Sequence, residues 1–189
     1  MKKAVLIKYK KSKKGFSLLE LLLVLGIISA LVVAAFIVYP KVQASQRAQA
    51  ESNNIATIQT GVKSLYTSAS SFTGLSNTVA VQAKIFPDNM LSGSESAVKP
   101  INAFKGDVIL GAAATGPSKT PGSSFNITYS NVPAAECTKI VTAAAGNFYE
   151  VGVGVAANVK AAGDVLDVSK TATQCSAGGN SNTLIFTAI

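Results

Sequence analysis

The chain has 189 residues, which is enough for one globular domain and an additional extended segment. Its formal net charge is +8, but seven of its 17 basic side chains are lysines within the first 14 residues, where there is no acidic residue, so the ten basic and nine acidic side chains that follow nearly balance. The chain contains no histidine and no basic face beyond that stretch, which excludes a Ser-His-Asp triad and argues against a nucleic-acid-binding surface.

A long apolar segment follows the basic stretch. Residues 16–39 are apolar with few exceptions, and residues 21–38 carry no charged side chain. Because a helix rises about 1.5 Å per residue, this segment would span roughly 36 Å, more than the roughly 30 Å of a hydrocarbon core. The lysines precede the segment, so we expect its N-terminal end to face the cytoplasm and the residues after Pro40 to lie outside.

The apolar segment contains a carboxylate, Glu20, close to its N-terminal end. A cleavable signal peptide and a plain transmembrane anchor are the two ordinary explanations for such a segment. The run is longer than the apolar part of a typical signal peptide, although Ala30, Ala34 and Ala35 are small residues near which a signal peptidase could cut. A carboxylate at membrane depth costs several kcal/mol unless it is paired. Glu20 therefore favours a segment that is retained and that meets a partner for its charge.

The residues from Lys13 to Ile28 carry a motif. Their sequence, KKGFSLLELLLVLGII, resembles the class III signal of type IV prepilins. The resemblance implies that a prepilin peptidase cuts between Gly15 and Phe16 on the cytoplasmic side, ahead of the apolar segment, and that the new amine of Phe16 is N-methylated. Glu20 then falls at the fifth position of the mature chain, where the family has a glutamate.

The same resemblance implies a role for Glu20 in assembly. In the family, the amine of the first mature residue pairs with this glutamate of a neighbouring subunit, so that two charges in an apolar environment neutralise each other. An unpaired charge would be costly there, and the pair would therefore set the stagger between subunits rather than add net stability. The alternative is a solvated glutamate near the membrane interface.

Beyond Pro40, which we expect to kink or locally open the helix, residues 42–66 predict an amphipathic helix. Its apolar residues recur at helical spacing, and its polar residues fall mostly on other faces. The apolar positions are Ala48, Ile55, Ile58, Val62 and Leu65, and the polar ones are Gln49, Glu51, Asn53 and Gln59. One helix of about 50 residues, roughly 75 Å long, is unusual in a globular protein and suits a filament subunit.

The rest of the chain predicts an antiparallel sheet, because short β-branched or aromatic segments alternate with Gly, Pro, Ser and Asn turns. The candidate strands are Asp107–Leu110, Phe125–Ser130, Phe148–Val155, Val165–Val168 and Thr183–Ala188, and one short helix is expected near Val79–Phe86. Between two of these strands, Pro133–Ala145 predicts a helix. Pro133 suits its first turn, Glu136 suits the positive end of its dipole, and Gly146 can cap it.

The two cysteines, Cys137 and Cys175, lie in the C-terminal third. Isolated cysteines in a cytosolic chain are usually free thiols, but behind an export segment an even pair favours a disulfide bond. Cys137 would share one face of its helix with Ile140, Val141 and Ala144, which points it inward. The bond would close a loop of 37 intervening residues and contribute about 4 kcal/mol in the chain-entropy view.

Two further segments resemble type IVb pilins. Residues Val132–Val141 (VPAAECTKIV) are similar to the segment around the first cysteine of that group, and Phe72–Asn77 (FTGLSN) is similar to the connector after its long helix. The resemblance implies an α+β type IV pilin fold, in which a long N-terminal helix with a hydrophobic, protruding first half packs against an antiparallel β-sheet head with a disulfide-bounded C-terminal region. The loop from Cys137 to Cys175 would be the exposed, variable part of that head.

The expected organisation has three parts: a prepilin leader at 1–15, a hydrophobic transmembrane and assembly helix at 16–40, and a globular head at 41–189 that includes the C-terminal half of the long helix. The resemblance implies a structural subunit of a type IVb-like pilus for adhesion, aggregation or DNA transfer. It would lie in the bacterial inner membrane before assembly and in an extracellular pilus afterwards. The implied partners are further copies of this chain, a prepilin peptidase, and the inner-membrane platform and ATPase of the assembly machinery, with a host or bacterial surface as a further contact.

Two alternatives remain open at this point. A minor pilin or a pseudopilin of a type II secretion system would share the same N-terminus, and a membrane-anchored or secreted enzyme would belong to a different class. The sequence offers no acid–base constellation, so we expect neither catalysis nor a cofactor or metal. Asp164 and Asp167 lie in a turn-rich stretch and indicate a solvated loop rather than a calcium site.

Overall fold

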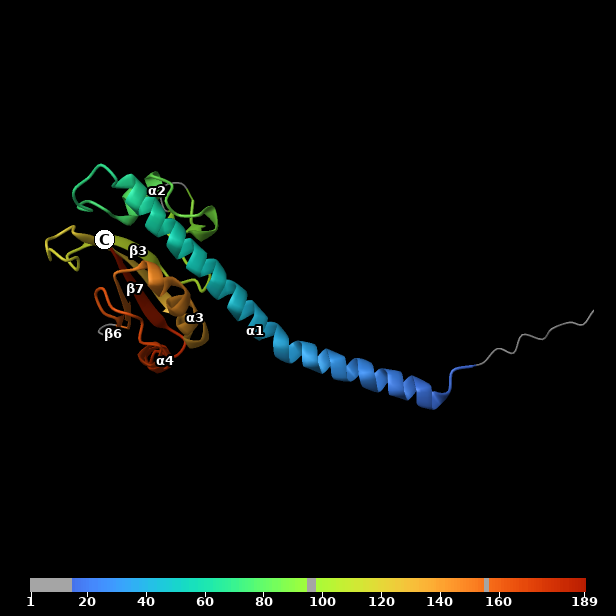
Figure 1. Cartoon of the computed structure of the whole chain (residues 1–189). Helices are drawn as coiled ribbons and strands as arrows, with labels where there is room; N and C mark the ends of the chain where they lie inside the picture. The colour runs from blue at the N-terminus through green and yellow to red at the C-terminus, as the bar shows by residue number, and fades with distance from the viewer. Residues whose placement is uncertain (1–14, 95–97, 155–156) are drawn as a thin grey trace, which may run out of the picture. The chain divides into compact units, whose positions relative to one another are not determined.

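The computed structural model describes residues 15–94, 98–154 and 157–189. The chain divides into two compact units, Met1–Lys41 and Val42–Ile189, and the second unit is hereafter the head. One helix, α1, runs from Leu18 to Leu65 and contributes residues to both units (Figure 1).

Helix α1 begins where a dense run of leucines, which are strong helix formers, follows the motif at its N-terminus. Pro40 lies inside the helix, and the helix continues through it to Leu65. Proline removes one backbone hydrogen bond, which is the basis for the expected local opening.

The head is built on a five-stranded antiparallel sheet with the strand order β3-β4-β7-β5-β6. The strands are β3 (Val108–Ala113), β4 (Ser124–Val132), β5 (Glu150–Val153), β6 (Ala157–Lys160) and β7 (Asn182–Ala188). A separate two-stranded ribbon pairs β1 (Leu91–Ser92) with β2 (Lys99–Pro100). Strand β7 pairs with β4 on one side and β5 on the other, so the C-terminal residues join the two halves of the sheet.

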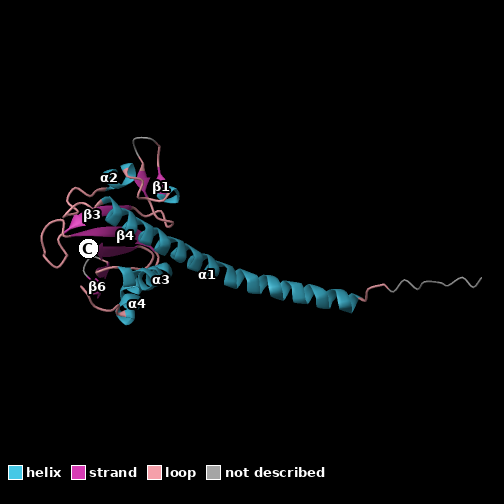
Figure 2. Ribbon diagram, turned by 45° about the horizontal axis from the view of Figure 1, so that its top comes forward, coloured by secondary structure: helices cyan, strands magenta, loops and turns pink. Residues whose placement is uncertain are grey.

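Alternating side chains build the core of the head. In β4, Phe125, Ile127 and Tyr129 are fully buried, while the residues between them are partly exposed. Residues 42–65 of α1 lie against the sheet (Figure 2) and add their apolar positions to the same core. This one-sided burial is what the period-two pattern of an antiparallel sheet predicts. The buried apolar residues of α1 are Ala48, Ile55, Ile58 and Val62.

Short helices fill the connections of the head. They are α2 (Asn77–Gln82), η1 (Asp88–Met90), α3 (Ala134–Ala144), η3 (Ala145–Asn147) and α4 (Val168–Ala177). The predicted helix after Pro133 is confirmed as α3, and Cys137, Ile140, Val141 and Ala144 form its buried face. The expected fold class is also confirmed, because a long N-terminal helix, an antiparallel sheet and a disulfide bond occur together.

One predicted strand, Val165–Val168, is wrong. Val165 is 82% exposed in a loop, and Val168 is the first residue of α4. The side chain of Asp167 accepts a hydrogen bond from the backbone N–H of Lys170 at 2.8 Å, so this aspartate is the N-cap of a helix. The two valines favour a strand by their local propensity, but the capping interaction of Asp167 stabilises a helix instead.

Candidate functional site

The first part of α1 presents an uncovered apolar surface. Every residue from 15 to 42 is exposed, and Phe16 reaches 83%. Within α1, one 18-residue window has a mean hydropathy of 3.1 with none of it buried, so the helix is long and apolar enough to cross a membrane. A contiguous apolar surface of this size is not stable in water. It therefore needs either lipid or other apolar helices around it.

The predicted processing site lies directly before this helix. Gly15, Phe16 and Ser17 precede the first helical residue, and all three are exposed. A Cβ built on Gly15 would have nothing within 4 Å. Exposed, non-helical segments of this kind are where proteases find their substrates. The Gly15–Phe16 bond thus has the local accessibility that cleavage requires.

Glu20 lies in the first turn of α1 and is exposed. A carboxylate at this end of a helix interacts favourably with the helix dipole. Its neighbours Leu19 and Leu21 are exposed apolar residues, so the acid lies on the surface that has to be covered. Any partner that covers this surface must also compensate the charge of Glu20.

A disulfide bond ties the two C-terminal helices together. Cys137 of α3 and Cys175 of α4 are both fully buried, and their Cα atoms are 5.8 Å apart. This separation is typical of disulfides. Thr171, one turn before Cys175, is also fully buried, so the bond lies inside a packed contact between the helices. The predicted pairing of the two cysteines is confirmed.

Glu51 of α1 belongs to a polar group of the head that sequence reasoning missed. Together with Gln59 it was expected on a face other than that of the apolar residues, yet both residues are buried. The Oε1 atom of Glu51 accepts a hydrogen bond from the backbone N–H of Ala103 at 2.7 Å, and the side-chain amide of Asn54 donates to Oε2 at 3.4 Å. The Tyr129 hydroxyl lies near this carboxyl and donates to Sδ of Met90 at 3.9 Å. Burial raises the pKa of Glu51 above its ordinary value, although the hydrogen bonds from Ala103 and Asn54 oppose the shift.

The loop that carries Ala103 is held in place by the buried amide of Asn102. Its Oδ1 accepts hydrogen bonds from the N–H groups of Phe104 and Gly106, both at 2.9 Å, and its Nδ2 donates to the Ser130 carbonyl at 2.7 Å. The loop is therefore fixed to the end of β4. A buried asparagine shortly before a glycine was the available sequence signal, but nothing in the pattern connected it with Glu51.

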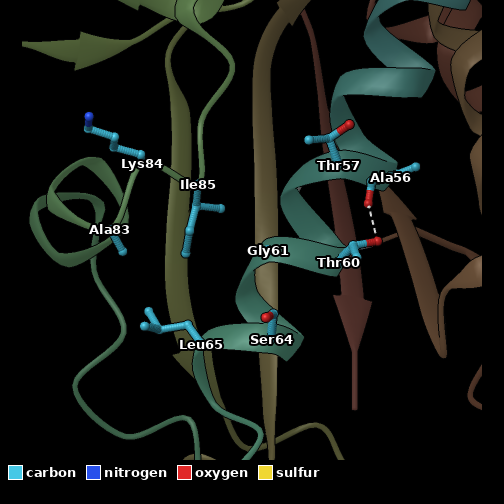
Figure 3. Close-up of a pocket in the computed structure, with 9 residues that line it drawn as sticks. All are labelled: Ala56, Thr57, Thr60, Gly61, Ser64, Leu65, Ala83, Lys84 and Ile85. Atoms are coloured by element: carbon cyan, nitrogen blue, oxygen red, sulfur yellow. Dashed lines mark hydrogen bonds between the residues drawn. The ribbon is translucent and has the colours of Figure 1, made fainter.

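A groove of about 630 Å³ runs along the head between α1 and the residues after α2 (Figure 3). Small side chains form its α1 side, and a Cβ on Gly61 would lie 2.9 Å from Cγ2 of Ile85. The lining residues are Ala56, Thr57, Thr60, Gly61, Ser64, Leu65, Ala83, Lys84 and Ile85. They include hydroxyl groups and one ammonium group but no carboxylate, so the groove lacks the pair of groups that general acid–base catalysis uses.

The aspartates of the C-terminal loop have local structural roles. Asp164 accepts a hydrogen bond from the N–H of Val165, and Asp167 caps α4. Within the ranges that the structure describes, no three or more histidine, cysteine or acidic side chains are grouped to hold a metal ion.

Comparisons with protein families match nearly the whole chain in two parts. The family model described as "PilS N terminal" matches residues 45–189, and the model described as "Prokaryotic N-terminal methylation motif" matches residues 10–36. Two curated relatives are each described as "Major structural subunit of bundle-forming pilus", from Escherichia coli O111:H- and from Escherichia coli O127:H6 (strain E2348/69 / EPEC). Each is 22% identical over 167 residues, which cover 87% of this chain and 83% of the relative.

Solved structures share the fold. A type IV b pilin from Salmonella typhi matches with a TM-score of 0.58 at 19% identity, over 73% of this chain and 97% of that one. TcpA, a type IV pilin from Vibrio cholerae El Tor biotype, matches with a TM-score of 0.51 at 13% identity, over 78% of this chain and 99% of that one. The expected resemblance to type IVb pilins is confirmed at the level of the fold.

Proposed function

Because this chain belongs to the PilS family and carries the prokaryotic N-terminal methylation motif, we propose that it is the structural subunit of a type IVb-like pilus. The observation that carries this proposal is the exposed apolar part of α1, which begins at the motif and has no cover within its own unit. Curated relatives that cover most of this chain are major pilus subunits, which supports the same role.

The proposal divides the chain as the sequence does, into a leader at 1–15, an assembly helix at 16–40 and a head at 41–189. A prepilin peptidase would cut between Gly15 and Phe16, after which the amine of Phe16 would be N-methylated. The exposed, non-helical conformation of these residues and the match to the methylation motif support both steps.

The apolar surface then serves in two environments in succession. In the inner membrane it is covered by lipid, and in the pilus it is covered by the same segment of other copies. Both environments satisfy its need for apolar surroundings without any change in the helix. An inner-membrane platform and an ATPase would drive the transfer, and the finished pilus would meet a host or bacterial surface.

Glu20 would set the stagger between copies. Transfer from lipid to a bundle of apolar helices leaves its carboxylate without water, and the cationic amine of Phe16 in a neighbouring copy is the charge that can compensate it. Only one stagger brings the two together, and every other stagger leaves a charge unpaired in an apolar environment, at a cost of about 3–5 kcal/mol.

Glu20→Ala in the full-length chain, expressed in a piliated host, tests this role. We expect normal cleavage and membrane residence but at least about tenfold fewer sheared filaments, because the alanine variant leaves the Phe16 amine unpaired. Ser17→Ala, which changes an exposed polar residue of the same segment, is the matched control and should leave filament yield unchanged. Normal filaments from the Glu20 variant would contradict the assigned role.

A further inference from the structure

Glu51 is a costly residue at its position in the head. Its side chain is 2% exposed and lies on the helix face that otherwise carries Ala48, Ile55 and Ile58. An apolar side chain of similar size would fill this site without the loss of hydration that a carboxylate suffers. Stability alone therefore does not explain why a glutamate is here.

The carboxyl is held by a backbone group from outside its own helix. The N–H of Ala103 comes from the loop before β3, and the hydroxyl of Tyr129, in the central part of β4, lies beside the carboxyl. The loop cannot drift, because Asn102 binds both its own loop and the Ser130 carbonyl. Its close approach to β4 also depends on Gly106, since a Cβ there would overlap the Ser130 carbonyl oxygen. The Ala103 N–H therefore marks one fixed point in front of α1.

Within the described parts of the head, no cation interacts with this carboxyl, and the buried hydroxyl of Tyr129 is the ionisable group that lies beside it. Arg47, one turn earlier on α1, and Lys105 and Asp107, at the far end of the loop, are exposed to water. The ionised form is thus supported by hydrogen bonds alone.

This arrangement permits one register of α1 on the sheet. A shift of α1 by four residues moves each side chain by about 6 Å along the axis but only about 40° around it, so the apolar stripe still faces the sheet. The carboxyl would then leave the Ala103 N–H and remain buried, whereas the small and aliphatic side chains of the same face would lose much less. A buried polar group whose partners are fixed therefore favours one packing arrangement over others that would bury similar apolar surface.

We propose that Glu51 is a positioning residue that fixes the register of α1 on the head through the hydrogen bond that it accepts from the Ala103 N–H. The proposal concerns the head of the single chain and does not depend on the filament role.

The pH dependence of head stability follows from the direction in which the pKa of Glu51 is shifted. Burial raises the pKa of Glu51 in the folded head above its ordinary value of 4.5. The stabilisation that accompanies the proton is therefore fully present below 4.5 and is lost as the pH rises through the raised pKa of the folded state. The Glu51 contribution thus favours the folded head in mild acid over neutral solution.

Urea unfolding of the full-length chain in detergent micelles, between about pH 5 and about pH 8, tests the protonation. Glu51→Gln keeps the shape and one acceptor oxygen for the Ala103 N–H, and it removes the charge. We expect the urea midpoint of this variant near neutral pH to be at least as high as that of the wild type. On acidification the midpoint of the wild type should rise, whereas that of the variant should not. Glu136→Gln, which changes the other buried glutamate of a head helix, is the matched control and should keep that shift.

Amide NMR spectra of the same samples test the register. The wild type and Glu51→Gln should each give one set of resonances for residues 42–65 of α1, with the Ala103 amide protected from hydrogen exchange. Glu51→Leu should fold but lose that protection and give more than one set of resonances. An unchanged acid shift in Glu51→Gln would overturn the protonation claim, and a single, protected set in Glu51→Leu would overturn the register claim.

Discussion

The two units of this chain use apolar residues in opposite ways. Between Phe16 and Lys41 the large apolar side chains are exposed, whereas in the head most of them are buried in one core. Exposed large apolar residues of the head are scattered singly along it, for example Ile109 and Val165. The head therefore satisfies its own apolar residues, and the N-terminal segment depends on what surrounds it.

This contrast predicts which property each kind of substitution should change. Changes in the apolar segment should alter membrane residence and filament formation and leave the stability of the head unchanged. Changes in the core of the head should do the reverse. A substitution in one unit that changed both filament formation and head stability would contradict this division between the units.

The largest effect on filament formation is expected from a charge in the apolar segment. Val32→Asp places a carboxylate near the middle of the uncharged run, at a cost of about 2.5–3.5 kcal/mol for membrane insertion. We expect it to abolish filaments and to leave the urea midpoint of the head unchanged. Val165→Asp puts the same charge on an exposed position of the head and should affect neither quantity. Filaments from the Val32 variant would mean that this surface is not covered in the pilus.

Loss of the disulfide bond should give the largest effect on head stability. The paired change Cys137→Ser and Cys175→Ser should lower the free energy of unfolding by about 4 kcal/mol, because the bond closes a long loop in the unfolded chain. Urea unfolding measures the loss, and the wild type in a reducing agent should show a similar one. The paired variant should still enter the membrane. An unchanged midpoint would show that the helices α3 and α4 do not need the bond.

Gly106→Ala should destabilise the head by about 2–4 kcal/mol, because the new methyl group must displace the Ser130 carbonyl from its place beside Asn102. Gly111→Ala is the control: a Cβ there meets nothing within 4 Å, and we expect no measurable loss. Both values come from urea unfolding of the full chain. Equal stability of the two variants would contradict the close approach of the loop to β4.

The smallest of these effects should come from Asn77→Ala at the edge of the sheet. The Asn77 amide donates to the Val108 carbonyl at 2.9 Å and accepts from the Leu110 N–H at 2.7 Å, so it satisfies backbone groups on the side of β3 away from β4. Its loss should cost about 1–2 kcal/mol. An uncovered edge also favours association through strand pairing, which light scattering would detect. Thr78→Ala, at the exposed next position, should change neither reading.

Local patterns were sufficient for α1 and α3, whereas the pairing of the cysteines was inferred from their number behind an export segment. The apolar run and its continuation at helical spacing predicted α1, and Pro133 with the spacing from Cys137 to Ala144 predicted α3. These features depend on residues within a few turns of one another. The type IV pilin fold followed from the motif at the N-terminus together with these elements.

Features that depend on distant residues were not predictable in the same way. The donor that binds Glu51 lies 52 residues away in sequence. The polar character of this glutamate, rather than its position between Ala48 and Ile55, led to the wrong expectation for its face. The residues Val165–Val168 carried a β signal that the Asp167 cap overrides. The roles of Gly15, Phe16 and Glu20 involve a peptidase and other copies of the chain, so they remain predictions that the structure of a single chain does not test.

The mass of the N-terminal peptide of subunits from sheared filaments tests the central claim most directly. If the apolar helix is retained and used for assembly, the peptide begins at Phe16 and carries one methyl group on its amine. A peptide that begins beyond Tyr39 would show that the segment was removed during export, which would contradict its role in holding the filament together.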